Sequence, residues 1–310
     1  MKKISVLIPC FNEVENVEPI SEAIVNEITT KLPQYDYEVV FIDNFSIDGT
    51  RDKLEEICSN NKKIKAIFNA KNFGQFNSPF YGMCQTTGDC TICMCADFQD
   101  PIDLISRFVA EWEKGYKIVS AIKTQSEENK LVRFLRTCYY KVIKKMSSVE
   151  QIEHFTGTGL YDKSFINVLR QLDDPTPFLR GIVAELGPLR KDIPYTQAKR
   201  RAGHTHNNWY TLYDAAMLSF TSYTKFGLRM ATFAGFMFAS LTMLVAVLYL
   251  IAKLIWWDRF PMGTAPLLIG TFFMGSVQLF FIGLLGEYVL NINTRIMHRP
   301  LVVEERRINF

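Results

Sequence analysis

Short apolar runs alternate with helical patterns over the first 120 residues. Five runs rich in Val, Ile, Leu, Phe and Cys predict strands, at Ile4–Pro9, Tyr37–Asp43, Ile64–Asn69, Thr91–Ala96 and Lys117–Ala121. Continuous apolar runs of this length are typical of strands covered on both faces. Four segments between and after these runs have apolar residues at helical spacing: Val14–Thr30, Thr50–Ser59, Phe76–Thr86 and Ile102–Glu113. The alternation predicts an α/β domain with a mostly parallel sheet and right-handed crossovers.

Two longer stretches near the carboxyl end contain no charged residue, from Met230 to Ala252 and from Phe260 to Gly286. About 20 apolar helical residues cross a bilayer core about 30 Å thick, so each stretch is long enough. We therefore expect a head at residues 1–206 and membrane spans at 230–255 and 262–286. The aromatic-rich segment 207–229 predicts an amphipathic helix at the membrane interface.

The distribution of basic residues predicts the orientation of these spans. The connection between them is short, whereas the tail at 287–310 carries Arg295, Arg299, Arg306 and Arg307. Because cytoplasmic segments carry an excess of Lys and Arg, head and tail are expected in the cytoplasm. The sequence thus predicts a multi-pass protein of the cell (inner) membrane.

Overall charge and cysteine content exclude other classes of protein. The chain has 35 Lys and Arg residues and 32 Asp and Glu residues, which gives a net charge of +3. Because no basic run is present, nucleic acid is not an expected partner. The seven cysteines are odd in number and predict a reducing compartment. Cys90, Cys93 and Cys95 lack the second pair that a zinc finger needs, which favours a buried strand.

Three polar loops follow predicted strands: Pro9–Glu13, Asp43–Thr50 and Cys95–Pro101. In parallel sheets, ligands bind beyond the carboxyl ends of the strands, so these loops are the candidate site. Asp97 and Gln99 alternate on an extended segment, and their oxygens can point to the same side. Hard oxygen ligands suit Mg²⁺ or Mn²⁺ that bridges a diphosphate. Turn formation and helix capping are the alternative roles of these loops.

The ordered loops resemble the inverting family-two glycosyltransferases, and more narrowly the polyisoprenyl-phosphate glycosyltransferases. The matching elements are Asp43 to Thr50, Asn72 to Gly74, Cys95 to Pro101, Arg200 to His206, and Gly286 to Pro300. The resemblance covers essentially the whole chain. It implies a Rossmann-like GT-A nucleotide-diphospho-sugar transferase domain, followed by interfacial helices and two transmembrane helices.

The resemblance also implies roles for individual residues. Metal binding falls to Asp97 and Gln99, with Mg²⁺ or Mn²⁺ as the ion. Catalytic roles fall to Asp97, Asp100 and Arg200, where Asp100 orients the sugar or acceptor or, alternatively, caps the helix at Pro101. The residues implied to bind the nucleotide sugar are Pro9, Phe11, Glu13, Ile42, Asp43, Ala96, Asp97, Lys123, Arg200 and His206.

Four positions depart from the family pattern. Cys95 replaces the first Asp of the metal element, Asn44 the second Asp of the nucleoside element, and Phe45 its Gly. His206 replaces a Lys. These changes predict weaker metal binding or a different donor, and they leave open a non-catalytic membrane scaffold that retains the fold.

The implied reaction moves one sugar from a nucleotide-diphosphate sugar, with UDP-glucose as the default donor, to a polyprenyl phosphate with inversion. A phosphate monoester has a second pKa near 6, so its oxygen is anionic at neutral pH and needs no strong general base. The basic amphipathic segment Leu131–Met146 offers Arg133 and Arg136 to steer the acceptor phosphate, unless these are only surface charges. The expected partners are the donor, polyprenyl phosphate and the lipid bilayer. Another lipid acceptor and a homo-oligomer remain open.

Overall fold

The computed structural model describes residues 1–125, 152–198, 201, 217–218, 220–221, 226–255, 264–297 and 299–310. Four predicted site residues lie outside these ranges: Arg133, Arg136, Arg200 and His206. Their roles, and most of the predicted interfacial helix at 207–229, stay predictions.

The head is built on an eight-stranded sheet with the order β7-β5-β6-β4-β1-β2-β3-β8. Strands β1, β2, β3 and β4 run parallel, as do β5 and β7, whereas β6 and β8 are antiparallel to their neighbours. The predicted α/β class with a mostly parallel sheet is confirmed. The strands are β1 (Lys3–Cys10), β2 (Asp36–Asp43), β3 (Ile64–Asn69), β4 (Cys90–Cys93), β5 (Ile118–Gln125), β6 (Phe155–Asp162), β7 (Arg190–Thr196) and β8 (Glu304–Ile308).

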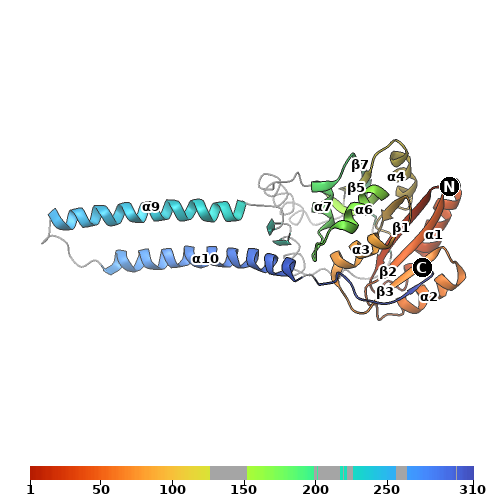
Figure 1. The fold of residues 1–310 in the computed structure, drawn as a ribbon, viewed down its shortest axis with the longest axis horizontal. Coiled ribbons are helices and arrows are strands. Elements are labelled where there is room, and N and C mark those ends of the chain that lie inside the picture. The colour runs from red at the N-terminus through yellow and green to blue at the C-terminus, as the bar shows by residue number, and fades with distance from the viewer. Residues whose placement is uncertain are drawn as a thin grey trace.

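Helices cover both faces of this sheet (Figure 1). Along β1, the side chains of Val6 and Ile8 belong to one apolar cluster, and that of Leu7 belongs to a second cluster on the opposite face. This double coverage explains the continuous apolar strands. The helices of the first face are α1 (Val17–Lys31), α2 (Thr50–Asn60) and α4 (Leu104–Glu113); those of the second are α3 (Gly74–Gln85), α6 (Lys163–Gln171) and α7 (Leu179–Leu186).

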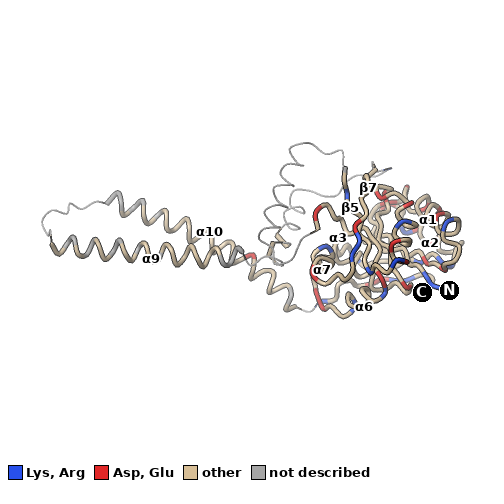
Figure 2. The backbone as a smooth tube through the Cα atoms, turned by 90° about the horizontal axis from the view of Figure 1, so that it is seen from above, with Lys and Arg blue, Asp and Glu red and all other residues tan. Residues whose placement is uncertain are grey.

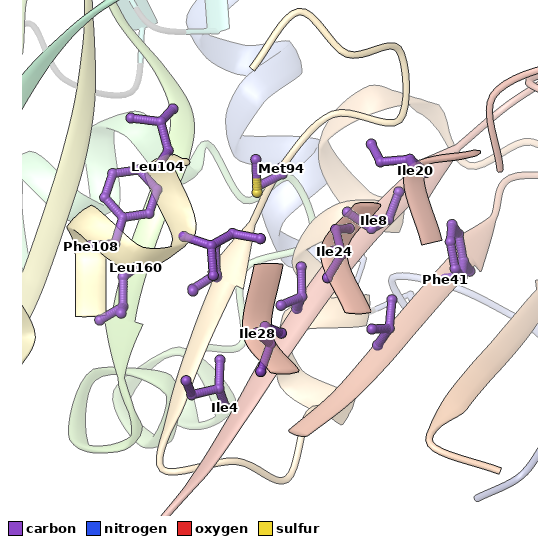
Figure 3. Close-up of a cluster of buried hydrophobic side chains, with 14 of the residues drawn as sticks. Ile4, Ile8, Ile20, Ile24, Ile28, Phe41, Met94, Leu104, Phe108 and Leu160 are labelled. Carbon is purple, nitrogen blue, oxygen red and sulfur yellow. The ribbon is translucent and has the colours of Figure 1, made fainter. Parts of the chain in front are cut away.

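The first-face cluster forms the larger core (Figure 3). Its helical contribution from α1 repeats every four residues, which places the apolar side chains on one stripe facing the strands. The labelled members in Figure 3 come from α1, α4 and four strands or strand ends: Ile4, Ile8, Ile20, Ile24, Ile28, Phe41, Met94, Leu104, Phe108 and Leu160.

Two long helices, α9 (Phe226–Ile255) and α10 (Thr264–Ile296), leave the head and run side by side (Figure 1). Their described parts carry few charged residues (Figure 2). Within the described ranges, one stretch, Phe273–Thr294 of α10, is long and apolar enough to cross a membrane. Helix α10 continues beyond Gly286, the predicted end of the second span. The span predicted at 230–255 stays a prediction.

The chain returns from α10 to the head and ends in the sheet. Strand β8 pairs antiparallel with β3 at the sheet edge. The side-chain amide of Asn309 donates to the carbonyl oxygens of Cys58 (2.7 Å) and Ile64 (2.8 Å). The carboxyl-terminal residues therefore form a strand of the head, which the sequence did not predict.

Candidate functional site

A cavity of about 860 Å³ lies at the carboxyl ends of the central strands and extends to α10. Its volume is within the range of small-molecule sites in proteins. Five of the predicted donor-binding residues line it: Pro9, Phe11, Glu13, Ala96 and Asp97. Four other described candidates, Ile42, Asp43, Gln99 and Lys123, are not among its lining residues, and neither is Asp100.

The loops after β1 and β2 hold each other by hydrogen bonds. The backbone N–H of Asn12 donates to Ser46 Oγ (2.8 Å), and Asn12 Oδ1 accepts from the backbone N–H of Ile47 (2.9 Å). The backbone N–H of Glu13 donates to Thr50 Oγ1 (2.9 Å). Asn12 itself has a positive φ of 56°. These bonds fix the Pro9–Glu13 loop, which forms part of the cavity wall. Asn12 does not cap the following helix.

Asp43, at the end of β2, is fully buried and already bonded within the protein. Arg51 Nε donates to Asp43 Oδ2 (3.0 Å), and the backbone N–H groups of Phe45 and Ser46 donate to its carboxylate at 3.2 Å. Burial raises the pKa of Asp43, and the hydrogen bonds and Arg51 offset only part of this rise. The carboxylate shapes the loop, and its predicted contact with the nucleoside stays a prediction.

Arg51 connects this carboxylate with the carboxyl-terminal strand. Its Nη2 donates to Glu305 Oε2 of β8 (2.8 Å) and to the carbonyl oxygen of Asn69 at the end of β3 (3.1 Å). The sequence analysis missed Arg51 and Glu305. The only sequence feature that points to Arg51 is its position directly after the Asp43–Thr50 element. No sequence feature indicates that Glu305 lies next to Arg51.

The structure shows the contacts of two residues that depart from the family pattern, and it explains the first of them. Asn44 Nδ2 donates to Asn72 Oδ1 (2.9 Å), while Asn44 Oδ1 accepts from the backbone N–H of Phe73 (2.9 Å). An ionised Asp could accept but not donate, so the amide suits this position better. Phe45 has φ 70°, a conformation that favours Gly, and its ring lies 5.5 Å from the Arg51 guanidinium carbon.

The predicted metal loop begins earlier than expected, because β4 ends at Cys93 rather than at Ala96. Asp97 is nearly buried, and its Oδ1 accepts from the backbone N–H of Gln99 (3.1 Å). The carbonyl oxygens of Asp97 and Gln99 accept from the backbone N–H groups of Arg201 (3.2 Å) and Ala198 (3.1 Å). The loop is thus fixed on both sides of Asp97.

The donor set around Asp97 suits a metal that the substrate helps to bind. Within the described residues, no group of three His, Cys, Asp or Glu side chains could hold an ion. Mg²⁺ commonly binds one or two carboxylates and takes its remaining ligands from phosphate and water. Asp97 on the cavity wall fits that arrangement, whereas the second ligand predicted at Gln99 does not line the cavity.

Asp100 anchors the metal loop from inside the protein. Its carboxylate accepts from the backbone N–H of Cys95 (3.1 Å), from Thr158 Oγ1 of β6 (2.9 Å) and from the Tyr195 hydroxyl of β7 (2.9 Å). Asp100 is buried, and helix α4 begins only at Leu104, so capping at Pro101 is not observed. These contacts favour a positioning role over direct catalysis.

Two more predicted residues are placed by the structure. Cys95 lines the cavity, where desolvation of its thiol and the carboxylates of Asp100 and Asp97 raise the pKa of the thiol far above the ordinary value. A protonated thiol is a poor metal ligand. Lys123, near the end of β5, is half-buried and donates its backbone N–H to the carbonyl oxygen of His154 (3.2 Å).

Cys95→Asp should strengthen binding of Mg²⁺ or Mn²⁺, because a second carboxylate would stand beside Asp97. We expect the ion concentration for half-maximal nucleotide binding to fall by about tenfold, which corresponds to about 1.4 kcal/mol. Isothermal titration of nucleotide at several ion concentrations measures this. Cys95→Asn is the control of similar shape without charge. An unchanged ion dependence in the Asp variant would show that position 95 does not face the metal.

The strand order, the helices on both faces and the cavity at the strand ends define an α/β protein with a GT-A-like fold. Residues 5–187, more than half of the chain, match Glycosyl transferase family 2. The chain therefore belongs to this family of glycosyltransferases.

Similar curated proteins support this assignment over the whole length of the chain. The chain is 30% identical over 299 residues to the bactoprenol glucosyl transferase of Shigella phage SfV, covering 96% of each protein. It is 29% identical over 305 residues to the prophage bactoprenol glucosyl transferase homolog of Escherichia coli strain K12, covering 98% of this chain and 99% of that one. Among solved structures, the mannosyl-3-phosphoglycerate synthase of Rubrobacter xylanophilus shares the fold, with a TM-score of 0.50, 14% identity and coverage of 70% of this chain and 71% of that one.

Proposed function

We propose that this glycosyltransferase moves a single sugar from a nucleotide-diphosphate sugar to a polyprenyl phosphate, with inversion, at the cytoplasmic face of a membrane. The names of its full-length relatives favour this acceptor. The observation that carries the proposal is the continuity of the cavity. Its wall includes Phe11 and Asp97 from the strand-end loops and Leu290 and Asn291 from the apolar helix α10. A water-soluble donor and a lipid acceptor can therefore meet in one chamber.

Different residues of the chain would bind the donor and the acceptor. Asp97 would hold Mg²⁺ or Mn²⁺ against the diphosphate, and the ion would supply positive charge for the leaving group. Phe11 and Glu13, which line the cavity on the adjoining loop, would contact the nucleoside. Because the acceptor phosphate is already anionic at neutral pH, the protein's task is to position it. We propose UDP-glucose as donor.

The test uses the full chain in detergent with undecaprenyl phosphate and a panel of labelled UDP- and GDP-sugars. Label that enters the organic phase is counted with Mg²⁺, with Mn²⁺ and with a chelator. We expect transfer from one donor, loss of transfer in chelator, and no transfer to undecaprenol, which lacks the phosphate. Transfer to undecaprenol or to diacylglycerol would show a different acceptor. Nucleotide-sugar binding without transfer to any acceptor would support the scaffold alternative.

A further inference from the structure

The wall of the cavity also includes residues of α7, of the segment before it, and of α10. Thr176, Phe178 and Arg180 line it on the side of the head, and Glu287 and Asn291 line it on the side of α10. Asn291 Nδ2 donates to Thr221 Oγ1 (2.7 Å), which fixes one edge of this region. Polar side chains in an apolar helix commonly mark a substrate site.

Arg180 gives this region a positive charge. It is the only Lys or Arg among the described lining residues, and within the described part of the chain no carboxylate forms an ion pair with it. Its guanidinium carbon lies 5.9 Å from the ring centroid of Phe178, which holds the side chain at the wall. A guanidinium in this setting favours a phosphate, which it can bind through two hydrogen bonds.

Thr176 provides a second, independent observation. Its Oγ1 is buried and has no hydrogen-bond partner among the described residues. An unsatisfied buried hydroxyl is unfavourable, so a ligand that accepts its hydrogen bond is favoured.

We infer that Arg180, together with Thr176 of the same cavity wall, binds the phosphate group of the lipid acceptor at the α7–α10 end of the cavity. This inference rests on the proposed function and adds a site for the acceptor. The lipid chain would leave along the apolar helix α10, past Leu290. A phosphate oxygen would form the new bond to the anomeric carbon. The bond from that carbon to the diphosphate would break, and its electron pair would leave on the nucleoside diphosphate.

The experiment compares the full-length protein with its Arg180→Gln and Arg180→Lys variants in lipid nanodiscs. Binding of undecaprenyl phosphate and of undecaprenol is measured by native mass spectrometry, and KM values for acceptor and donor are measured in the transfer assay. Arg190→Gln is the matched control, because Arg190 is an exposed arginine of β7 that pairs with Asp192 (2.9 Å) outside the cavity.

Arg180→Gln should weaken binding of undecaprenyl phosphate and raise its KM by about 10- to 100-fold, as expected for loss of a charged hydrogen bond. The KM of the donor should stay unchanged, the preference for the phosphate over the alcohol should fall, and Arg180→Lys should recover part of the affinity. A milder loss is expected for Thr176→Val.

The outcomes separate the acceptor site from the reaction. If Arg180→Gln and Arg180→Lys both bind undecaprenyl phosphate as the wild type does, the acceptor site is overturned, whatever the wild type transfers. If the wild type binds the phosphate through Arg180 but transfers no sugar to it, the site stands and the proposed reaction fails.

Discussion

Asp97→Asn should lower the rate of sugar transfer by at least about 10³-fold, equivalent to about 4 kcal/mol of transition-state stabilisation. Asp97 is the carboxylate of the metal loop that lines the cavity. In the proposed role of Asp97, removing its charge would take away the protein ligand of the divalent ion, and the leaving diphosphate would no longer be neutralised. The fold should persist, because an Asn side chain still accepts from the backbone N–H of Gln99, as Asp97 Oδ1 does at 3.1 Å.

Turnover of undecaprenyl phosphate and the thermal unfolding midpoint are measured side by side for the wild type and the variant. Asp103→Asn is the control, because Asp103 lies in the same connection but is exposed and faces Arg107 at 3.6 Å. We expect full activity from this control. Full activity of Asp97→Asn at low Mg²⁺ would falsify the assignment of Asp97 to the metal.

The first half of the fold could be predicted because its strands are covered on both faces. Continuous apolar runs mark β1, β2 and β3 to within a residue or two at either end. Helix ends were harder, since local hydrogen bonding decides them. Helix α1 begins at Val17 rather than Val14, and residues 14–16 before it form a turn in which the backbone N–H groups of Asn16 and Val17 both donate to the carbonyl oxygen of Glu13.

Strand β8 shows where sequence patterns fail. Its residues, Glu304 to Ile308, are four charged side chains followed by one apolar side chain, without the alternation of a half-buried strand. Its partner β3 lies more than 230 residues earlier in the chain, as in the pairing of Ala66 with Ile308. Tertiary contacts determine this strand, and the sequence therefore predicted only a tail.

The candidate site was predictable in its location and less so in its contacts. The rule that ligands bind at strand ends correctly brought Phe11 and Asp97 to one cavity. Residue spacing alone could not show that Arg51 donates a hydrogen bond to the Asp43 carboxylate. This contact depends on side-chain packing in the first turn of α2. The position of Arg180 on the cavity wall was also missed, because only the folded chain brings residues of α7 and α10 to one cavity.

The largest effect on stability is expected at the opposite end of β2, at the buried Glu38. Its carboxylate accepts from Ser5 Oγ (2.6 Å), from the backbone N–H of Thr87 (2.7 Å) and from Lys3 Nζ (2.7 Å), and it pairs with Lys65 Nζ at 2.9 Å. Burial raises the pKa of Glu38, but these hydrogen bonds and the two ammonium groups outweigh it and lower the pKa to about 2.

Glu38→Gln should reduce the free energy of unfolding at pH 7 by about 3 kcal/mol, because it leaves two ammonium groups without their shared carboxylate. The figure is at the lower end of the range for buried pairs, since the Lys3 side chain keeps 29% of its exposure and is partly screened by solvent. Asp36→Asn is the control on the same strand. Its exposed pair with Lys63 should contribute less than about 1 kcal/mol.

The lowered pKa of Glu38 determines how its contribution to stability changes with pH. Because the pKa of Glu38 is lower in the folded protein than in the unfolded chain, its stabilisation is complete above the unfolded value of about 4.5. The stabilisation is lost as the pH falls from there to about 2. In urea unfolding of the full chain in detergent, the wild type should therefore exceed Glu38→Gln most at pH 7 and progressively less below pH 4.5. A difference that stays constant down to pH 2.5 would mean that the hydrogen bonds of Glu38 do not depend on its charge.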